Sequence, residues 1–405
     1  MSRNGLAIGM AVILGGGLTH VTAQSGPGGS PSVNARAKAM RSQGWELAYN
    51  LDHAEALSTL EEAIALEPDE PALHRLAASI VWMGILFESG AVLVDDYLGQ
   101  AEGVVERPKP SPSAARSFSD HITRALELAE RRLRDDDGDP DAHFQLGSSL
   151  GMLATYAATV EGRVLGSFGN VRRAFREHER VLELSPSRKD AGLLPGMYRY
   201  SVARASLPLR LAARLGGITG SLEQGVLQVK EAAAYPSEAQ PGAMFISVVI
   251  YNREKRYDDA LRVIRDLQRR YPRNRLLWLE SGTTAIRAGR AQAARTELER
   301  GLAMLSADSR PRAFGEEARW RLSHGMALLS LDRGEAARQL RAALDVDGPQ
   351  WVRGRAHGEL GKLADLHGHR TEALEEYRTA VRLCRAGNDR PCSEDVSRLI
   401  RTPYR

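Results

Sequence analysis

The sequence predicts an all-α protein built from repeated pairs of antiparallel helices, a solenoid in which each pair packs against its neighbours. Two observations lead to this fold class. Small and large apolar residues recur with one helical spacing along the chain, and proline follows several of these copies. In addition, 405 residues exceed what one ordinary hydrophobic core fills, whereas a solenoid has no such limit because each repeat contacts only its neighbours.

Residues 1–23 have the three-part pattern of a secretory signal peptide. Arg3 and the free amine supply positive charge, and an uncharged apolar stretch follows from Leu6 to Leu18 before a group of small residues. We therefore expect export across an inner membrane to a bacterial periplasm, with cleavage close to Gln24 and a flexible leader over residues 24–36. A retained anchor is the weaker alternative, because this apolar stretch is short for spanning a bilayer.

One spacing of apolar residues recurs along the rest of the chain. Ala260, Ile264 and Leu267 lie at i, i+4 and i+7, so they share one face of a helix that Pro272 then ends. The other copies are Ala56, Leu60 and Ala63; Ala174, His178 and Val181; Ala294, Leu298 and Gly301; Ala336, Leu340 and Ala343; and Ala373, Tyr377 and Ala380. A preceding helix carries a large residue and then a small one, as in Trp278 with Gly282, Trp320 with Gly325, and Leu360-Gly361.

This pattern resembles the tetratricopeptide repeat (TPR), a pair of antiparallel helices with small residues where the two helices touch. Glycine and alanine let the backbones approach while large residues fill the gaps above and below. The resemblance covers about residues 241–387 and one unit near 37–70, and the four later units start near Pro241, Arg275, Glu317 and Gly354. It implies a right-handed superhelical solenoid in which the first helix of each unit lines the concave side.

The other segments interrupt this pattern. An apolar helical stretch from Leu73 to Leu98 is broken by Gly84 and Gly90, and a unit near Pro140 has its two halves fifteen residues further apart than usual, which predicts about two extra turns in each helix. The expected organisation after the leader is an N-terminal unit with apolar helices over 37–104, a Pro/Ser-rich loop over 105–118, divergent hairpins over 119–235, four units over 236–387 and a tail over 388–405.

Three local patterns resemble functional sites, and a structural interpretation is stronger for each. Gly147–Gly151 matches the Gly-x-Ser-x-Gly nucleophile motif but lies inside a helix that begins at Asp139-Pro140, not on a strand-to-helix turn. Asp135–Asp139 is acidic but does not fit the ligand positions of a calcium loop, and His367 and His369 have no third metal ligand beside them. We therefore predict no enzyme activity, no cofactor and no metal.

The expected function is protein–protein interaction in the cell envelope, with a peptide segment or folded protein of unknown identity as partner. The formal net charge of +4 is small for this length, which argues against nucleic acid as a partner. The alternative is a peripheral membrane-surface protein, because Tyr198 to Ala213 is apolar with interspersed arginines, as in a basic amphipathic helix.

The TPR resemblance also implies a binding face on the first helices. The family's usual contact positions map to Phe245, Val249, Asn252, Arg253, Leu279, Thr283, Ile286, Arg287, Arg321, Lys362 and Asp365. Apolar anchors mixed with cations would suit an extended peptide that carries an acidic group. Phe245 and Val249 stand where chaperone-binding TPRs have Lys and Asn, so we do not expect a chaperone carboxylate as ligand. Phe245, Val249 and Ile286 could equally pack between helices, and Arg253 and Arg287 are expected to be exposed.

The two cysteines of the chain, Cys384 and Cys392, lie close together near the C-terminus. The intervening loop contains Gly387 and Pro391 and can fold back on the last repeat helix. In an oxidising compartment we expect a disulfide between them that stabilises the end of the solenoid. Two free thiols are the alternative.

Overall fold

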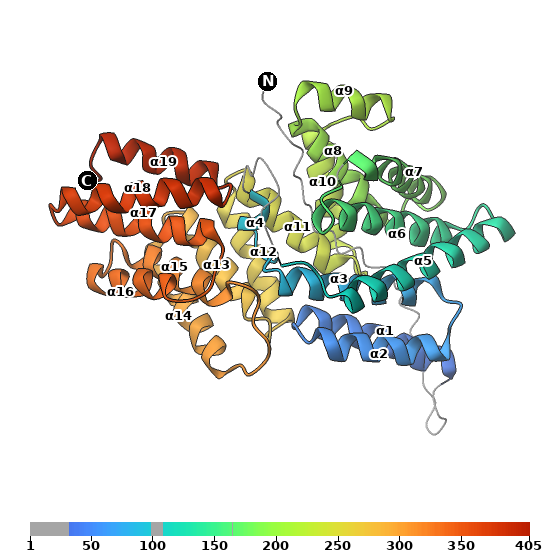
Figure 1. The fold of residues 1–405 in the computed structure, drawn as a ribbon. Coiled ribbons are helices and arrows are strands. Elements are labelled where there is room, and N and C mark those ends of the chain that lie inside the picture. Colours follow the sequence, from blue (N-terminus) through green and yellow to red (C-terminus); the bar gives the residue numbers. More distant parts are fainter. Residues whose placement is uncertain (1–31, 99–107, 164) are drawn as a thin grey trace. The chain divides into compact units, whose positions relative to one another are not determined.

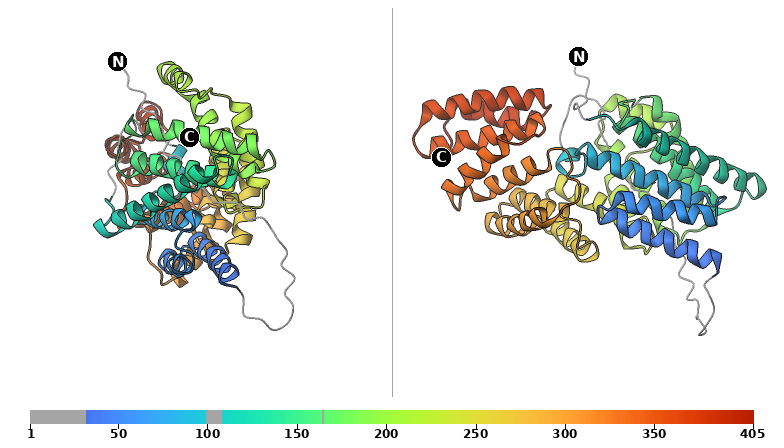
Figure 2. Two further views of the ribbon diagram at one scale, coloured as in Figure 1. Left: turned by 90° about the vertical axis from the view of Figure 1, so that its right-hand side faces the viewer. Right: turned by 60° about the horizontal axis from the view of Figure 1, so that its bottom comes forward.

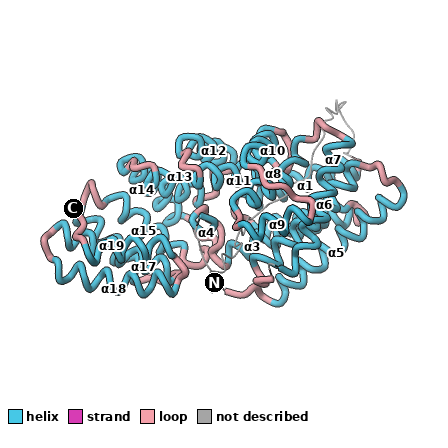
Figure 3. Tube along the Cα trace, turned by 90° about the horizontal axis from the view of Figure 1, so that it is seen from above, coloured by secondary structure: helices cyan, strands magenta, loops and turns pink. Residues whose placement is uncertain are grey.

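The structure is a computed structural model and describes residues 32–98, 108–163 and 165–405 (Figure 1). These residues form 19 α-helices and two short 3-10 helices, and the described chain contains no strand (Figure 3). The all-α fold class is therefore confirmed. The predicted signal peptide and most of the leader lie outside the described residues.

The chain forms two compact units. Among the described residues, the N-terminal unit comprises 32–85 and 110–250, and the C-terminal unit comprises 86–98, 108–109 and 251–405. Helices α3 (Pro71–Glu88) and α11 (Gln240–Arg253) each have residues in both units.

Helix pairs build the N-terminal unit (Figure 2). Helices α1 and α2, α6 and α7, and α8 and α10 form its closest packed pairs, and α5 packs on α6. A core of this unit includes Leu146, Leu193, Tyr200 and Ile246. The helices of this unit besides α3 and α11 are α1 (Val33–Tyr49), α2 (His53–Leu66), α5 (Pro112–Asp135), α6 (Pro140–Thr159), α7 (Phe168–Leu184), α8 (Leu193–Arg204), α9 (Leu207–Leu215) and α10 (Leu222–Ala234), with 3-10 turns at Leu165–Ser167 and Lys189–Gly192.

The C-terminal unit is a regular series of helix pairs. Helices α13 and α14, α15 and α16, and α17 and α18 pair, and each second helix packs on the first helix of the next pair. The first helices also contact one another, α13 with α15 and α15 with α17. The helices are α4 (Asp95–Leu98), α12 (Tyr257–Arg270), α13 (Leu276–Arg287), α14 (Ala291–Ala307), α15 (Glu316–Leu328), α16 (Arg333–Leu344), α17 (Gln350–Leu366), α18 (Arg370–Ala386) and α19 (Arg390–Arg401).

The recurring glycines lie where the two helices of a pair come closest. A Cβ at Gly325 would stand 2.7 Å from Leu340 Cγ, and one at Gly361 would stand 2.5 Å from Tyr377 Cε1. Gly282 faces Leu298 in the same way, at a separation too small for a side chain. Each glycine of the first helix thus receives the large residue of the i, i+4, i+7 face of the second, which is why the two patterns recur together.

Three helices lie where the sequence predicts a leader, a loop and a tail, and a capping residue precedes each of them. Helix α1 begins at Val33, inside the expected leader, where the Ser32 hydroxyl accepts a hydrogen bond from Ala35 N. Helix α5 begins at Pro112, inside the expected loop, with Ser111 as its cap. The expected tail contains α19, which begins after Asp389, and its Val396 packs beside Cys384 and Tyr377.

The divergent region also differs from its prediction. Helix α6 has 20 residues, but α7 has 17, as α14 and α18 do, so the extra length lies in α6 and in the connection after it. Gly84 does not interrupt α3, whereas Gly90 follows its end with a φ of 72°. Between α8 and α10 the chain forms a short helix, α9.

Candidate binding site on the first helices of the C-terminal repeats

Residues 91–98 of the chain lie against the first helices of the C-terminal repeats. We call the surface made by α13, α15, α17 and the last residues of α11 the A-helix face, and we call residues 91–98 the inserted segment. The segment begins at Gly90, whose positive φ and close approach to the Phe314 carbonyl oxygen leave no room for a side chain. Its tight turn is closed by Ala91 N–H, which donates to Leu86 O at 2.8 Å.

Main-chain hydrogen bonds anchor the inserted segment. Val94 N–H donates to Glu280 Oε2 of α13 at 2.9 Å, and Arg253 of α11 donates to Tyr97 O at 2.6 Å. Within the segment, Leu93 N–H donates to Asp96 Oδ2 at 3.0 Å. These bonds fix the backbone so that the Asp95 and Asp96 carboxylates both meet the A-helix face.

Three arginines from three successive first helices receive these two carboxylates. Arg319 of α15 binds Asp96 through both terminal nitrogens, at 2.9 and 3.1 Å, and the two side chains are only 6% and 2% exposed. Arg287 of α13 lies 3.0 Å from Asp95 Oδ2, and Arg355 of α17 lies 3.4 Å from Asp95 Oδ1. Bidentate pairing of a guanidinium with a carboxylate is the strongest hydrogen-bonded ion pair available to side chains.

An aromatic ring supports two of these arginines. The Arg319 and Arg355 guanidinium carbons lie 5.1 and 4.8 Å from the centre of the Trp351 ring of α17. A cation beside an aromatic face is attracted to it and loses little rotational freedom on binding a carboxylate. Space remains beside the ring, since a cavity of about 70 Å³ lies between Leu93, Met326 and Trp351.

The charges of the site shift two pKa values in opposite directions. Burial raises the pKa of Asp95, but the positive charges of Arg287 and Arg355 outweigh it and hold the pKa below its ordinary range. Burial raises the pKa of Glu280 to about 7, against the opposing charge of Arg287. Asp95 is therefore ionised throughout the physiological range, whereas Glu280 takes up a proton near neutrality.

The predicted binding residues lie in several places. Asn252, Arg253, Thr283, Ile286 and Arg287 lie at the A-helix face: Asn252 accepts a hydrogen bond from Arg287 at 2.8 Å, and Thr283 and Ile286 line the cavity. Leu279 is fully buried in α13, while Phe245 is half-buried and Val249 buried in the part of α11 that belongs to the N-terminal unit. Their roles in partner binding stay predictions.

The last three predicted residues contact their own repeats. Arg321 donates to Gln339 at 3.1 Å, and Lys362 donates to Glu359 at 2.6 Å. Asp365 accepts hydrogen bonds from Arg370 and from the Tyr377 hydroxyl at 2.9 Å. The expectation that Arg253 and Arg287 are exposed is wrong, because both are half-buried by the inserted segment.

Sequence reasoning missed Arg319, Arg355 and Trp351. The recurring glycines contain a signal that could have found the two arginines, since each lies six residues before the close-contact glycine of its helix, Gly325 or Gly361. The contact positions of the third unit were counted from a start near Glu317, which shifted them by one residue relative to Gly325. The opposing Asp95 and Asp96 have no such signal, because they lie far away in sequence.

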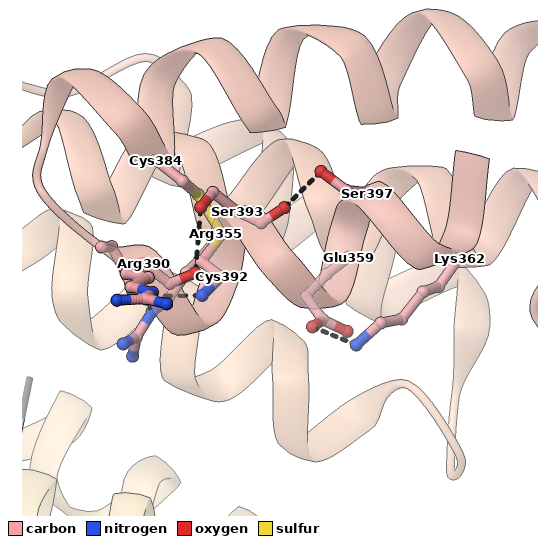
Figure 4. Close-up of a disulfide and its surroundings, with 9 residues drawn as sticks. Arg355, Glu359, Lys362, Cys384, Arg390, Cys392, Ser393 and Ser397 are labelled. Atoms are coloured by element: carbon pink, nitrogen blue, oxygen red, sulfur yellow. Dashed lines mark hydrogen bonds and ion pairs between the residues drawn. A yellow bond between two sulfur atoms is a disulfide. The ribbon is translucent and has the colours of Figure 1, made fainter. Parts of the chain in front are cut away.

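A disulfide closes the C-terminal end of the repeats (Figure 4). Cys384 of α18 and Cys392 of α19 are joined, with their Cα atoms 5.9 Å apart. Between them, Asp389 caps α19 by accepting from Cys392 N, and its other carboxylate oxygen accepts from Arg355 Nε at 2.6 Å. Cys384, Asp389 and Cys392 are also the one group of three close potential metal ligands among the described residues, but the disulfide occupies both sulfurs.

The three motifs set aside as structural have ordinary packing roles. Ser148 and Ser149 are fully buried within α6, which begins directly after its cap Asp139 and not after a strand. Asp139 caps α6 by accepting from Asp141 N and Ala142 N. His367 and His369 flank Gly368 in the turn between α17 and α18.

Known proteins share the repeat but little sequence. Residues 252–310 match the family model described as "Tetratricopeptide repeat". The crystal structure of YrrB, "a TPR protein with an unusual peptide-binding site", is 15% identical, with a TM-score of 0.29 over 67% of this chain and 98% of that chain. Yeast Tom70 is 13% identical, with a TM-score of 0.39 over 90% of this chain and 82% of that chain.

Human IFIT1 with m7Gppp-AAAA is 16% identical, with a TM-score of 0.42 over 93% of this chain and 84% of that chain. No curated protein matches the chain. The family match over 252–310 coincides with α12, α13 and α14 and with one of the glycine-to-leucine contacts that recur from pair to pair. The family match therefore shows a tetratricopeptide repeat at residues 252–310, and the same glycine-to-leucine contact recurs in the helix pair that follows.

Proposed function

We propose that the chain is a protein-interaction scaffold of the cell envelope whose A-helix face binds an acidic segment of a partner protein. The observation that supports this proposal is the set of three arginines, Arg287, Arg319 and Arg355, which converge on two neighbouring carboxylates from three successive repeats. A core of folded repeats needs no such convergence, because apolar contacts alone stabilise the helix pairs.

The chemistry of the face favours a short acidic segment over a single charge. Bidentate pairing with Arg319 fixes one carboxylate in the plane of the guanidinium, and Arg287 and Arg355 together hold the next. Glu280 accepts a main-chain N–H one residue before the first carboxylate, so it sets the register of the ligand backbone. The expected ligand is a short apolar stretch followed by two adjacent acidic residues, which in the inserted segment are the first two residues of α4.

The location in the envelope rests on two features of the chain. The N-terminal pattern of a short cationic stretch followed by apolar residues is that of an exported protein. A disulfide between Cys384 and Cys392 persists in an oxidising compartment and is rare in a reducing one.

Site-specific photo-crosslinking in cells tests the proposal. A benzophenone amino acid in place of Met326, which lines the cavity on the A-helix face, should form an adduct with one partner, and the crosslinked peptide should contain adjacent Asp or Glu residues. Arg355→Gln should abolish the adduct. Arg321→Gln is the matched control, because Arg321 is similarly exposed but donates to Gln339 of α16. An adduct that persists in Arg355→Gln, on a peptide without acidic residues, would contradict the proposal.

A second candidate function, attachment to an anionic membrane surface, is favoured by α9. Leu207, Leu211 and Leu215 are 60%, 55% and 88% exposed and lie at i, i+4 and i+8, so they form one apolar stripe. Arg210 and Arg214 are exposed beside this stripe. None of the helices in the described part of the chain is long and apolar enough to cross a bilayer.

Vesicle flotation tests this second function. Liposomes with anionic lipid should carry the protein upward, and Leu211→Asp should abolish flotation because it places a charge in the middle of the stripe. Leu331→Asp is the control, since Leu331 is a singly exposed leucine in the turn after α15. Flotation that is equal in the two variants would exclude α9 as the attachment site.

A further inference from the structure

We infer that the inserted segment, residues 91–98, is a ligand in cis that blocks the A-helix face, and that the acidic segment of a partner binds by replacing it. This inference rests on the proposed function and adds to it. It assigns a regulatory role to Asp95 and Asp96. It also takes the contacts of the inserted segment as those that the partner's acidic segment would make.

The contacts of the segment are those of a bound peptide. Its backbone is held at two points, Val94 N–H on Glu280 and Tyr97 O on Arg253, and its two acidic side chains meet the three arginines. Apolar side chains accompany them, with Leu93 and Val94 4% and 0% exposed. The segment is a tight turn that leads into the single helical turn α4, in which Tyr97 N–H and Leu98 N–H both donate to Val94 O.

The segment is not part of the repeat architecture. It follows α3 and Gly90, and it contributes no helix to the pairs α13–α14, α15–α16 and α17–α18 that build this unit. The pairs have their own core, which includes Ala318, Leu340, Val352 and Leu360. Loss of the segment from the face would therefore expose the arginines and Trp351 without opening that core.

The positive charges of the A-helix face determine which kind of peptide can replace the inserted segment. Three arginines face two carboxylates of the segment; Arg355 has a further partner in Asp389, and Arg287 has one in Glu280. Unpaired arginines in a partly buried face are unfavourable, so the face favours a replacement that supplies two carboxylates of its own. A neutral peptide leaves Arg319 without a carboxylate, and a single carboxylate can take the place of Asp96 at Arg319 or of Asp95 at Arg287 and Arg355, but not of both.

Exchange has a quantitative consequence. If the segment occupies the face for most of the time, the apparent dissociation constant of an external ligand rises by the inverse of the fraction of unoccupied protein. Releasing the segment should therefore tighten the binding of an external peptide by at least about tenfold, without any change in the face itself.

The experiment uses the full chain and a fluorescent synthetic peptide with the sequence of residues 91–98. Two variants release the segment by different means. Asp95→Asn/Asp96→Asn removes its carboxylates, and Gly90→Ala forces its first turn against the Phe314 carbonyl while leaving every arginine in place. Asp135→Asn/Asp137→Asn is the charge-matched control, because these exposed residues lie at the end of α5 and just beyond it. Circular dichroism checks that each variant retains its helices.

By fluorescence anisotropy, both releasing variants should bind the peptide at least about tenfold more tightly than the unmodified chain and the control variant. A peptide with Asn in place of both aspartates should bind none of them. Equal binding to all four proteins would overturn the inference and leave the proposed function standing, since the face would then accept the peptide without competition. Absence of binding to every protein would also overturn the inference, and the Met326 crosslink would then decide the proposed function alone.

Discussion

Acid destabilisation through His178 is a prediction whose size follows from the structure. His178 of α7 is fully buried, where it faces Gly147 and lies with its ring centre 5.2 Å from that of Phe144. Burial, together with the positive charges of Arg188 and Arg75, lowers its pKa to about 3. The imidazole is therefore neutral in the folded protein at every physiological pH, and Ser148 Oγ lies 3.4 Å from Nε2.

The sign follows from the lowered pKa. In the unfolded chain the imidazole has its ordinary pKa of about 6.5, so as the pH falls below that value the unfolded state binds a proton that the folded state refuses. Stability is then lost between about pH 6.5 and pH 3. One pKa unit corresponds to about 1.4 kcal/mol. A pH of 5 lies about 1.5 units below the pKa of the imidazole in the unfolded chain, so the free energy of unfolding falls by about 2 kcal/mol.

Replacement by leucine provides the matched variant. Leu60, Leu298 and Leu340 occupy the corresponding place opposite the close-contact glycine in other pairs, so a leucine at position 178 suits this packing. Urea unfolding at pH 7.5 and pH 5.0, followed by circular dichroism, should show a fall in the free energy of unfolding that is smaller by about 2 kcal/mol in His178→Leu. Hydrogen exchange of α6 and α7 should localise the difference. Identical pH dependence in the two proteins would refute the lowered pKa.

Three further predictions concern the C-terminal unit. Thiol counting on denatured, non-reduced protein should find no reactive thiol, and Cys392→Ser should destabilise the α18–α19 cap by about 2–3 kcal/mol; two reactive thiols would reject the bridge. Gly361→Ala should cost about 1–3 kcal/mol because its Cβ would stand 2.5 Å from the Tyr377 ring, whereas Gly334→Ala, at an exposed site in α16, should be neutral or stabilising by thermal unfolding. The raised pKa of Glu280 predicts stability that is lost as the pH rises from about 4.5 through about 7, and Glu280→Gln should flatten this part of the profile in urea titrations.

The repeats could be predicted from the sequence because the residues that contact one another lie close together in the chain. Gly325 and Leu340, or Gly361 and Tyr377, lie within one pair of helices, and the same spacing recurs in each pair. A periodic pattern of this kind specifies which faces touch without any knowledge of distant residues. Helix α19 was within reach by the same reasoning, since Asp389 and Pro391 are start signals and Val396, Leu399 and Ile400 are spaced as one apolar face.

The binding face could be predicted only in part. The resemblance to TPR proteins drew attention to the first helices and to cations there, and Asn252, Arg253 and Arg287 do lie at the A-helix face. The occupant of that face could not be predicted. Asp96 and Arg319 are 223 positions apart, and Asp95 and Arg355 are 260 apart, and one sequence offers no signal that pairs residues at such separations.

The disulfide and the inserted segment belong to one continuous set of contacts, although they lie at opposite ends of the unit's sequence. The bridge between Cys384 and Cys392 encloses Asp389, which is held in place as the cap of α19. Arg355 Nε donates a hydrogen bond to Asp389, and Nη1 of the same guanidinium donates one to Asp95. Arg355 also lies over Trp351, so its two carboxylate partners and the ring fix its plane from three sides. Since an arginine that is already oriented loses less freedom on pairing, the proposed function leads us to expect that the C-terminal cap increases the affinity of the A-helix face for a carboxylate that the cap never touches.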